Sequence, residues 1–277
     1  LLNSTFVQGS DGIYSASKPS FVSGQDAERK LREQVAVELY DNYLDSVARH
    51  HSIPVMDYEI DRFLVKIPQG GLILDVGGCW GWHWRRLAET RPDLEVLIID
   101  FVRANLVHAQ RVLGPLVGKQ VALMHADATD LPLPNSTFDG VWTVQAFQHI
   151  PNFGRACREA HRVLKPGGFF VNYSLHNTPF NRMVYWLLGK TFHKEGMREN
   201  KFYLNRADDR QRQTVLDIFI GEVTDRYTEC LHHPDLRLTF GGRVGSPIGY
   251  FDKLLGELPQ FGRWIARQRS FEARKST

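Results

Sequence analysis

The order of hydrophobic and polar positions predicts alternating strands and helices through the middle of the chain. Continuous apolar runs of the kind found in buried parallel strands occupy five segments: 72–76, 94–100, 121–128, 138–144 and 169–174. The segments between them have the polar and apolar spacing of surface helices, at 84–90, 104–113 and 152–164. Strands that alternate with helices and cross over right-handedly form a doubly wound, mostly parallel α/β sheet.

The flanking segments have a different character and divide the chain into four parts. Residues 1–67 are predicted to be a polar arm (1–24) followed by amphipathic helices (26–51 and 57–66) that cover a pocket, and 68–176 a ligand-binding core. Residues 177–215 include an aromatic-rich stretch that predicts a helical lid, and 216–277 are expected to complete the sheet with a helix at 248–258 and a final strand at 264–269. The basic residues at 263–275 are interpreted as a solvated end, with attraction of an anionic substrate or lipid as the alternative: Arg263, Arg267, Arg269, Arg274 and Lys275.

A glycine-rich turn follows the first strand of the core, in the stretch LILDVGGCWGWHW (72–84). Asp75 interrupts the apolar strand, and Gly77, Gly78 and Gly81 come directly after it. Glycines let a ligand approach the backbone closely at a helix N-terminus, whereas a buried carboxylate requires a donor partner. The stretch is therefore either a ligand-binding turn or an ordinary connection between strand and helix.

Two further strands also end in a carboxylate. Asp100 lies 25 residues beyond Asp75, the distance expected for an acid that accepts hydrogen bonds from ribose hydroxyls, and Asp127 follows the third strand. Each acid has an alternative role as a helix cap or turn residue, which for Asp127 alone is the preferred one.

Composition restricts the class of protein. With 277 residues, 43% hydrophobic and 23% charged, the chain suits a globular protein, and a net charge of +3 without a basic run does not indicate nucleic-acid binding. Three cysteines without metal-site spacing favour free thiols in a reducing compartment, the cytoplasm.

No apolar run reaches the ~18 residues of a membrane span, and no signal-peptide pattern begins the chain, although a trimmed leader stays open. Stable membrane insertion is not expected; an apolar stretch at 183–188, flanked by Arg182 and Lys190, leaves a membrane-surface role open.

The ordered motifs LILDVGGCWG, HADATDLPLPNSTFDGVW, QHIPN and RVLKPGGFF, with Asp100 ending the second strand, resemble class I S-adenosylmethionine-dependent methyltransferases, in particular the quinone-biosynthesis group. The resemblance covers about a third of the chain, from Ile73 to Tyr173. It implies a seven-stranded sheet with the last strand antiparallel, S-adenosylmethionine as cofactor and S-adenosylhomocysteine as product. It also implies transfer of the methyl group to an oxygen, carbon or nitrogen atom of a small, partly apolar molecule, in a biosynthetic reaction.

The same resemblance assigns cofactor roles to individual positions. The methionine part of the cofactor would be faced by Asp75, Gly77, Gly78 and Gly81. The methionine amino group and the sulfonium would lie near Thr143 to Gln145. Asp100 would hold the ribose hydroxyls. The remaining cofactor positions would contact the adenine: Phe101, Asp127 and Ala128.

Cys79 departs from the family pattern, because it stands where the turn usually has a glycine. A side chain tolerates a positive φ poorly, so the turn is expected either to differ slightly or to bind the cofactor more weakly. This departure keeps one alternative open: a catalytically silent methyltransferase fold that acts as a binding or regulatory protein.

Methyl transfer mainly requires alignment of the acceptor and exclusion of water, with a base if the acceptor must lose a proton. His149, after the fourth strand, is the candidate base, with a pocket-shaping role as its alternative, and His176 is a weaker candidate. The other histidines are assigned to surface or packing.

The lid and residues 25–58 are expected to enclose the acceptor, and no metal-ligand cluster is seen. A nicotinamide oxidoreductase ranks last because the glycine spacing does not fit one. The acceptor and the oligomeric state are not predicted.

Overall fold

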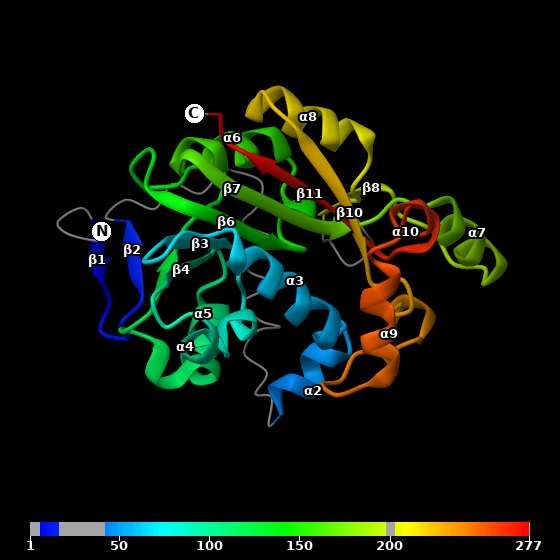
Figure 1. Cartoon of the computed structure of the whole chain (residues 1–277), viewed down its shortest axis with the longest axis horizontal. Helices are drawn as coiled ribbons and strands as arrows, with labels where there is room; N and C mark the ends of the chain where they lie inside the picture. The colour runs from blue at the N-terminus through cyan, green and yellow to red at the C-terminus, as the bar shows by residue number, and fades with distance from the viewer. Residues whose placement is uncertain (1–5, 17–41, 198–202, 277) are drawn as a thin grey trace.

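A mixed sheet forms the centre of the protein in a computed structural model that describes residues 6–16, 42–197 and 203–276 (Figure 1). Within these residues the sheet has nine strands. In spatial order they are β1 (Phe6–Gln8), β2 (Tyr14–Ala16), β5 (Val121–His125), β4 (Glu95–Asp100), β3 (Leu72–Val76), β6 (Phe138–Val144), β7 (Leu164–Leu175), β11 (Gln268–Arg274) and β10 (Val223–Thr228).

The five central strands are parallel, and the strand order reverses beside β3. From β3 the chain proceeds to β4 and β5 on one side, then crosses to β6 and β7 on the other. β11 is antiparallel to both of its neighbours, β7 and β10. The predicted doubly wound sheet with an antiparallel last strand is therefore confirmed. Such a reversal point opens a crevice at the carboxyl ends of the strands.

The strand count differs from the seven that the resemblance implies. Residues expected to be only a polar arm form an antiparallel hairpin, and β2 continues the sheet by pairing in parallel with β5. Ile13, which directly precedes β2, is fully buried, and Asp11 pairs with Arg103 of helix α5 (Arg103–Leu113) at 2.6 Å. Tertiary contacts of this kind order a short polar segment whose own sequence has no strand pattern.

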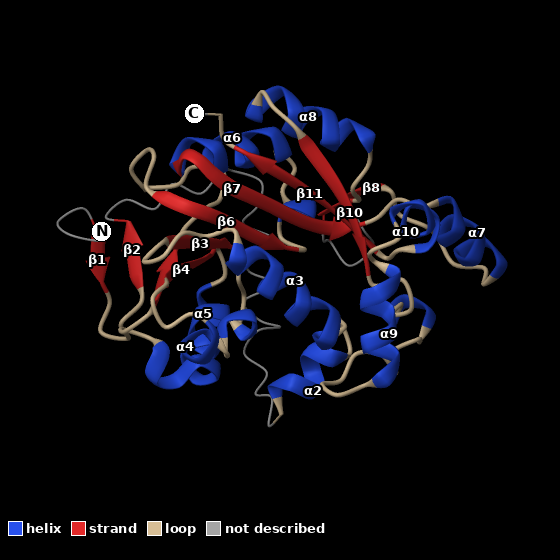
Figure 2. Ribbon diagram, in the orientation of Figure 1, coloured by secondary structure: helices blue, strands red, loops and turns tan. Residues whose placement is uncertain are grey.

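Helices cover both faces of the sheet, as Figure 2 shows. α3 and α5 lie over one face and α6 and α8 over the other, so β3 and β4 are buried on both sides. The helices are α2 (Tyr43–Ala48), α3 (Ile53–Val65), α4 (Leu87–Thr90), α5 (Arg103–Leu113), α6 (Phe153–Val163), α7 (Pro179–Leu187), α8 (Asp209–Phe219), α9 (Pro247–Leu255) and α10 (Pro259–Ile265), with short 3₁₀ turns η1 (Trp82–Trp84), η2 (Gly114–Leu116), η3 (Phe147–His149) and η4 (Pro234–Leu236). Of the amphipathic helix expected at 26–51, the part up to residue 41 lies outside the described residues.

The C-terminal segment corrects two expectations. The final strand that completes the sheet is confirmed as β11, but its predicted bounds, 264–269, are wrong, because α10 continues to Ile265 and β11 begins only at Gln268. The basic end is solvated only in part: Arg263 and Arg274 are exposed, whereas Arg267 and Arg269 are buried and ion-paired with Glu229 and Asp225. Carboxylates on the neighbouring chain segment, buried at Glu229 and partly exposed at Asp225, provide the partners that the sequence pattern did not reveal.

The segment expected to be a helical lid is only partly helical. It contains α7 and then a small antiparallel sheet of β8 (Glu195–Met197) and β9 (Tyr203–Asn205). Phe202, one of the aromatic residues of this aromatic-rich stretch, lies outside the described residues. Among the helices that the structure describes, none has the length and apolar character needed to cross a membrane.

Candidate active site

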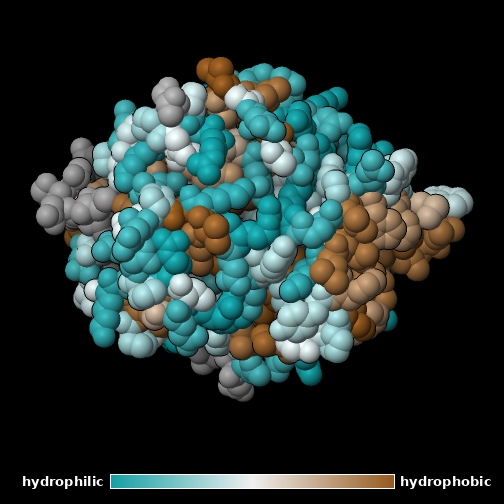
Figure 3. Space-filling model, viewed as in Figure 1, coloured by the Kyte–Doolittle hydropathy of each residue, from teal (hydrophilic) through white to brown (hydrophobic). Residues whose placement is uncertain are grey.

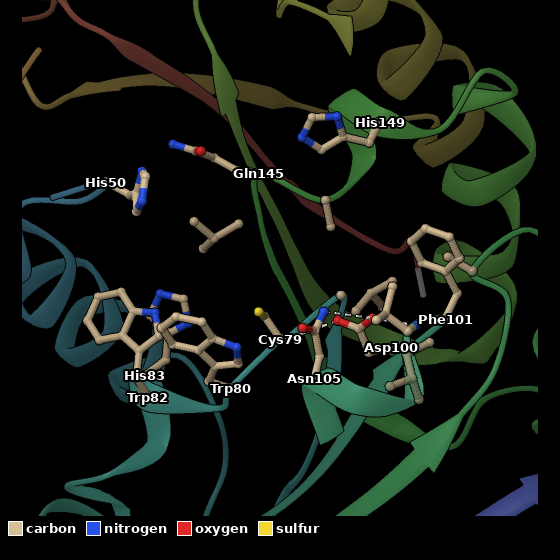
Figure 4. A pocket seen from close by; sticks show the side chains of 18 of the residues that line it. His50, Cys79, Trp80, Trp82, His83, Asp100, Phe101, Asn105, Gln145 and His149 are labelled. Carbon is tan, nitrogen blue, oxygen red and sulfur yellow. Dashed lines mark hydrogen bonds between the residues drawn. The ribbon is translucent and has the colours of Figure 1, made fainter. Parts of the chain in front are cut away.

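A cavity of about 400 Å³ lies at the carboxyl ends of β3, β4 and β6, next to the point where the strand order reverses. Figure 4 shows Asp100, Phe101 and Asn105 at one end of it and His50, Trp82 and His83 at the other, with Cys79 and Gln145 between them. The cavity is thus a single pocket with two chemically different ends.

Most of the predicted site residues are brought together on the wall of this cavity. Those that line it are Gly77, Gly78, Asp100, Phe101, Asp127, Ala128, Gln145 and His149. Asp75, Gly81 and Thr143 are not among its lining residues; Asp75 and Thr143 are buried in the strands behind it.

Steric limits explain two of the glycines. Gly77 has a φ of +71°, and a Cβ there would lie 2.3 Å from the Cβ of Ala146. A Cβ on Gly78 would lie 2.2 Å from Oδ2 of Asp75. Both amides donate to the carbonyl of Ile99, at 2.8 and 3.3 Å. The turn can therefore follow the floor of the cavity only with glycine at these two positions.

Asp75 is buried behind the glycine turn and contacts Trp84, which follows the turn. Its side chain is buried and accepts a 2.7 Å hydrogen bond from the indole nitrogen of Trp84. Burial raises the pKa of Asp75 to about 7, although the Trp84 bond opposes this shift, and nearby Asp100 adds to it. Its role in this structure is to fix the glycine turn rather than to face the cavity.

Asp100 joins the glycine turn to the helix that follows β4. Its carboxylate accepts hydrogen bonds from the amides of Val102 at 2.8 Å and Cys79 at 3.1 Å, and from the side chain of Asn105 at 3.3 Å. A carboxylate oriented in this way on a cavity wall is suited to accept further hydrogen bonds from a pair of hydroxyls.

Asp127 lies beside an apolar slot. One of its oxygens accepts hydrogen bonds from the amide and the hydroxyl of Thr129, both at 2.8 Å, which holds the carboxylate in place. Side chains around it on the cavity wall include those of Phe101, Ala128 and Ile150. An acceptor next to apolar surface suits a planar base with an amino group, and a nearby carboxylate such as Asp100, suited to accept from hydroxyls, adds what the sugar of a nucleoside requires. The residues present therefore fit S-adenosylmethionine.

Cys79 keeps the turn in the conformation that glycine usually provides. Its φ is 51°, in the left-handed region, and its amide still donates to Asp100. Of the two expected outcomes, a slightly different turn or weaker cofactor binding, the first is not seen, because Cys79 adopts the strained left-handed conformation and maintains its contact to Asp100. Weaker cofactor binding stays a prediction.

His149 lines the cavity and has both ring nitrogens engaged. Nδ1 lies 2.7 Å from the carbonyl oxygen of Tyr203, so it carries the proton, and Nε2 lies 3.2 Å from the side-chain amide of Gln148. Gln148 is oriented because its oxygen accepts from the amide of Leu175 at 2.7 Å. The ring is therefore held as the tautomer with an unprotonated Nε2. His176 is buried outside the cavity lining, and burial lowers its pKa to about 3.

The second end of the cavity contains residues that the sequence analysis did not select. His50, His51 and His83, assigned to surface or packing, line it, and so does Arg267 from the supposedly solvated end. These four residues come from segments up to 217 positions apart, between α2 and β11. The adjacent pair His50–His51 was the only local signal, and nothing in its pattern pointed to the cavity.

A buried ion pair organises this second end. Glu229 pairs with Arg267, and its other oxygen accepts a 2.7 Å hydrogen bond from the amide of Ser52. The pKa of Glu229 is about 2: burial would raise it, but the combined effect of Arg267, the neighbouring histidines and the amide of Ser52 outweighs burial. Burial lowers the pKa of His51 to about 3 and that of His83 well below its ordinary value, so both rings are neutral at pH 7.

Several buried polar atoms on the cavity wall lack a protein partner. Neither ring nitrogen of His83, nor the amide nitrogen of Gln145, nor Nε of Arg267 has a hydrogen-bond partner among the described residues. Unsatisfied buried polar atoms are rare in folded proteins, and their convergence on one cavity points to a polar group of a ligand.

Comparison with known proteins agrees with this geometry. Residues 74–172 match the family model described as a methyltransferase domain. This segment is a class I methyltransferase domain. It begins in β3, before the glycine turn, and ends in β7, so it includes Asp100, Asp127 and His149.

Two curated relatives and one solved structure show the extent of the similarity. The chain is 36% identical to a demethylmenaquinone methyltransferase of Symbiobacterium thermophilum, over 38% of this chain and 43% of that protein. It is 33% identical to a sterol 24-C-methyltransferase of Eremothecium gossypii, over 52% of this chain and 39% of that protein. The chain therefore spans less than half the length of these two relatives. Phosphoethanolamine N-methyltransferase 2 of Haemonchus contortus, solved with S-adenosyl-L-methionine, shares the fold of the methyltransferase domain with a TM-score of 0.55 at 18% identity, over 80% of this chain and 52% of that chain.

Proposed function

We propose that the protein is an enzyme that transfers a methyl group from S-adenosyl-L-methionine to a small, partly apolar acceptor, with S-adenosyl-L-homocysteine as the product. The observation that carries this proposal is Asp100, oriented on the cavity wall by the amides of Val102 and Cys79 at the end of β4. A methyltransferase domain supplies the context in which such a carboxylate binds ribose.

The cofactor would be held along the first end of the cavity. Gly77 and Gly78 allow the methionine part to approach the backbone, Asp100 accepts the ribose hydroxyls, and Asp127 accepts from the adenine amino group. Phe101 and Ala128 supply apolar contacts to the base. Bound there, the sulfonium supplies an already activated methyl group, so the chain's own residues need only align the acceptor and exclude water.

The second end of the cavity would hold the acceptor. The relatives named above act, by their names, on demethylmenaquinone and on a sterol, which are largely apolar molecules with a polar end. Trp82 and Val47 offer apolar walls, whereas His83, Gln145 and Arg267 offer polar atoms without a described protein partner. This combination favours an acceptor whose polar group carries the reacting atom and whose remainder is apolar.

His149 is proposed as the residue that accepts a proton when the acceptor must lose one. Its Nδ1–H donates to the carbonyl of Tyr203, which leaves Nε2 as the basic nitrogen, and Gln148 occupies that nitrogen until the acceptor replaces it. His149→Gln should lower the turnover number by about 100-fold while S-adenosylhomocysteine binding is unchanged. An unchanged turnover number would assign His149 to shaping the pocket.

Calorimetry with S-adenosylhomocysteine tests the cofactor part of the proposal. The wild-type protein should bind, and Asp100→Ala should weaken binding at least tenfold, because charge-assisted hydrogen bonds to the ribose are lost. Asp217→Ala, at an exposed carboxylate on α8, is the matched control and should bind as the wild type does. Circular dichroism shows whether each variant remains folded.

Absence of binding by the folded wild-type protein would contradict the proposal and favour the catalytically silent alternative. Methyl transfer from labelled cofactor into an extract of apolar metabolites then tests the acceptor class. The proposal includes a reducing compartment, the cytoplasm, which the buried thiols of Cys157 and Cys230 support.

A further inference from the structure

Three helices near the acceptor end of the cavity carry their apolar side chains on the outside of the molecule. Trp186 on α7 is 76% exposed and Trp264 on α10 is 61% exposed. Figure 3 shows the hydrophobic side chains gathered over α7, α9 and α10 at the right of the view. We call this the α7–α9–α10 surface, and its exposed apolar residues are Met183, Trp186, Leu187, Leu188, Phe240, Val244, Ile248, Tyr250, Phe251, Leu254, Leu258, Phe261 and Trp264.

These helices are inverted relative to ordinary surface helices. α9 turns Gly249 and Asp252 inward, where Asp252 is fully buried and accepts from the amides of Cys230 and Leu231 at 2.7 and 3.1 Å. α10 places Gly262 against Tyr227, at a position where a Cβ would lie 2.5 Å from that side chain. Because small or polar residues face the interior, the apolar residues cannot be explained by the protein's own core.

Charge around this surface restricts what covers it. Residues 179–190 and 237–265 contain six basic residues and two acidic ones, a balance of +4 that exceeds the +3 of the whole chain. Of the acids, Asp252 is buried and Glu257 is paired with Arg226 at 2.8 Å. The six basic residues are Arg182, Lys190, Arg237, Arg243, Lys253 and Arg263. Positive charge around an aromatic apolar area complements a bilayer with anionic headgroups.

The surface also adjoins the cavity. Arg267, which lines the cavity, follows α10 by two residues, and Gly242, close to Phe240 and Val244 of the surface, packs against the carbonyl of Ala48 beside the lining residue Val47. Trp side chains are preferred at the boundary between headgroups and acyl chains. We infer that the α7–α9–α10 surface docks the protein onto an anionic membrane surface, with Trp186 and Trp264 inserted between the lipids and the acceptor end of the cavity next to the bilayer.

Flotation with phospholipid vesicles tests this inference on the full chain. The wild-type protein should float with vesicles of phosphatidylcholine mixed with phosphatidylserine, bind pure phosphatidylcholine more weakly, and be released in part by high salt. Trp186→Ser combined with Trp264→Ser should reduce partitioning at least tenfold. The control is Val65→Ser, at an even more exposed apolar residue (84%) at the end of α3, which should partition as the wild type does.

A second pair of variants separates charge from apolar insertion. Lys190→Gln combined with Arg263→Gln should weaken binding to anionic vesicles by about fivefold per charge and leave binding to phosphatidylcholine unchanged. Arg111→Gln, on the exposed side of α5, is the control for a lost charge elsewhere. Asp100→Ala should float like the wild type, so this result does not depend on whether the cofactor proposal holds.

Three results would overturn the inference. The first is equal flotation of the wild type and the double tryptophan variant, and the second is no flotation of either. The third is that the wild type does not bind vesicles but self-associates with increasing concentration, as seen by light scattering, and that the tryptophan variant does not self-associate. This result would make the surface a contact between two copies of the chain.

Discussion

Cys79 shows how one residue can be strained without displacing the site around it. Its left-handed φ of 51° is disfavoured for any residue with a Cβ, yet its amide keeps the 3.1 Å contact to Asp100. The glycines on either side, Gly78 and Gly81, are enclosed by Asp75, Ile98 and Leu113. The turn therefore has no room to move in a way that would relieve the strain at Cys79. Stability, more than cofactor geometry, is therefore the property affected at this position.

Cys79→Gly should increase the free energy of unfolding by about 0.5–1 kcal/mol, because glycine adopts the left-handed conformation without steric cost. Cys79→Ala keeps the Cβ and should give no such gain. Urea unfolding of both variants measures the difference, and S-adenosylhomocysteine affinity should not decrease in Cys79→Gly. A glycine variant less stable than the alanine variant would show that Cys79 is not strained.

Asp75 gives the protein a pH dependence of known sign. Its folded pKa of about 7 is above the ordinary value of 3.8, so between these values the native state binds a proton that the unfolded chain has lost. The free energy of unfolding should therefore fall as pH rises from about 4 to 7, by at most about 1.4 kcal/mol per pH unit from this group. Asp75→Asn should remove this slope while the contact to Trp84 is retained. Identical slopes in the variant and the wild type would contradict the raised pKa.

At the scale of elements, one carboxylate connects three parts of the fold that build the acceptor end. Glu229 follows β10, accepts from the amide of Ser52 before α3, and pairs with Arg267 before β11. Its side chain is fully buried, so the pair is screened little by solvent. The position of Arg267 on the cavity wall thus depends on Glu229.

Glu229→Gln should lower the free energy of unfolding by about 3 kcal/mol or more, because the charge of Arg267 stays buried without its partner. Glu222→Gln, an exposed carboxylate at the start of the same region, should change it by less than ~0.5 kcal/mol. Replacing both partners, Glu229→Leu with Arg267→Met, should recover part of the loss. Denaturant unfolding at pH 7 compares the variants, and a cost for Glu229→Gln no larger than that for Glu222→Gln would refute the connection.

At the scale of the whole molecule, the cavity connects the ends of several parallel strands with a helix from the N-terminal part and an arginine from the C-terminal part. A ligand that fills it contacts all of these and should stabilise the folded chain as a unit. The two faces of the sheet remain covered by their own helices, so this stabilisation adds to that of the core.

S-adenosylhomocysteine at about 100 times its dissociation constant should add about 2.7 kcal/mol to the free energy of unfolding and raise Tm by several degrees. If Asp100→Ala weakens binding at least tenfold, the added free energy at the same ligand concentration should be at most about half as large in this variant. Differential scanning calorimetry measures both. A rise of equal size in the variant would show that the ligand does not use Asp100.

The sequence alone determined the features that depend on local pattern. Periodicity identified the central strands and the order of strands and helices, and the motifs placed Gly77, Gly78, Asp100 and Asp127 at strand ends that a parallel sheet brings to one edge. Chain order and handedness restrict such a sheet to few topologies, so short-range signals were sufficient there.

Only the tertiary structure decided which distant residues meet. Arg267 looked like part of a solvated tail until the carboxylate of Glu229 gave it a buried partner, and the hairpin of β1 and β2 exists because β5 offers an edge. The outward direction of Trp186 and Trp264 likewise depends on which side of each helix faces the sheet. Each of these outcomes depends on contacts between segments far apart in the chain, and the free energy of such contacts has no counterpart in the local pattern of residues.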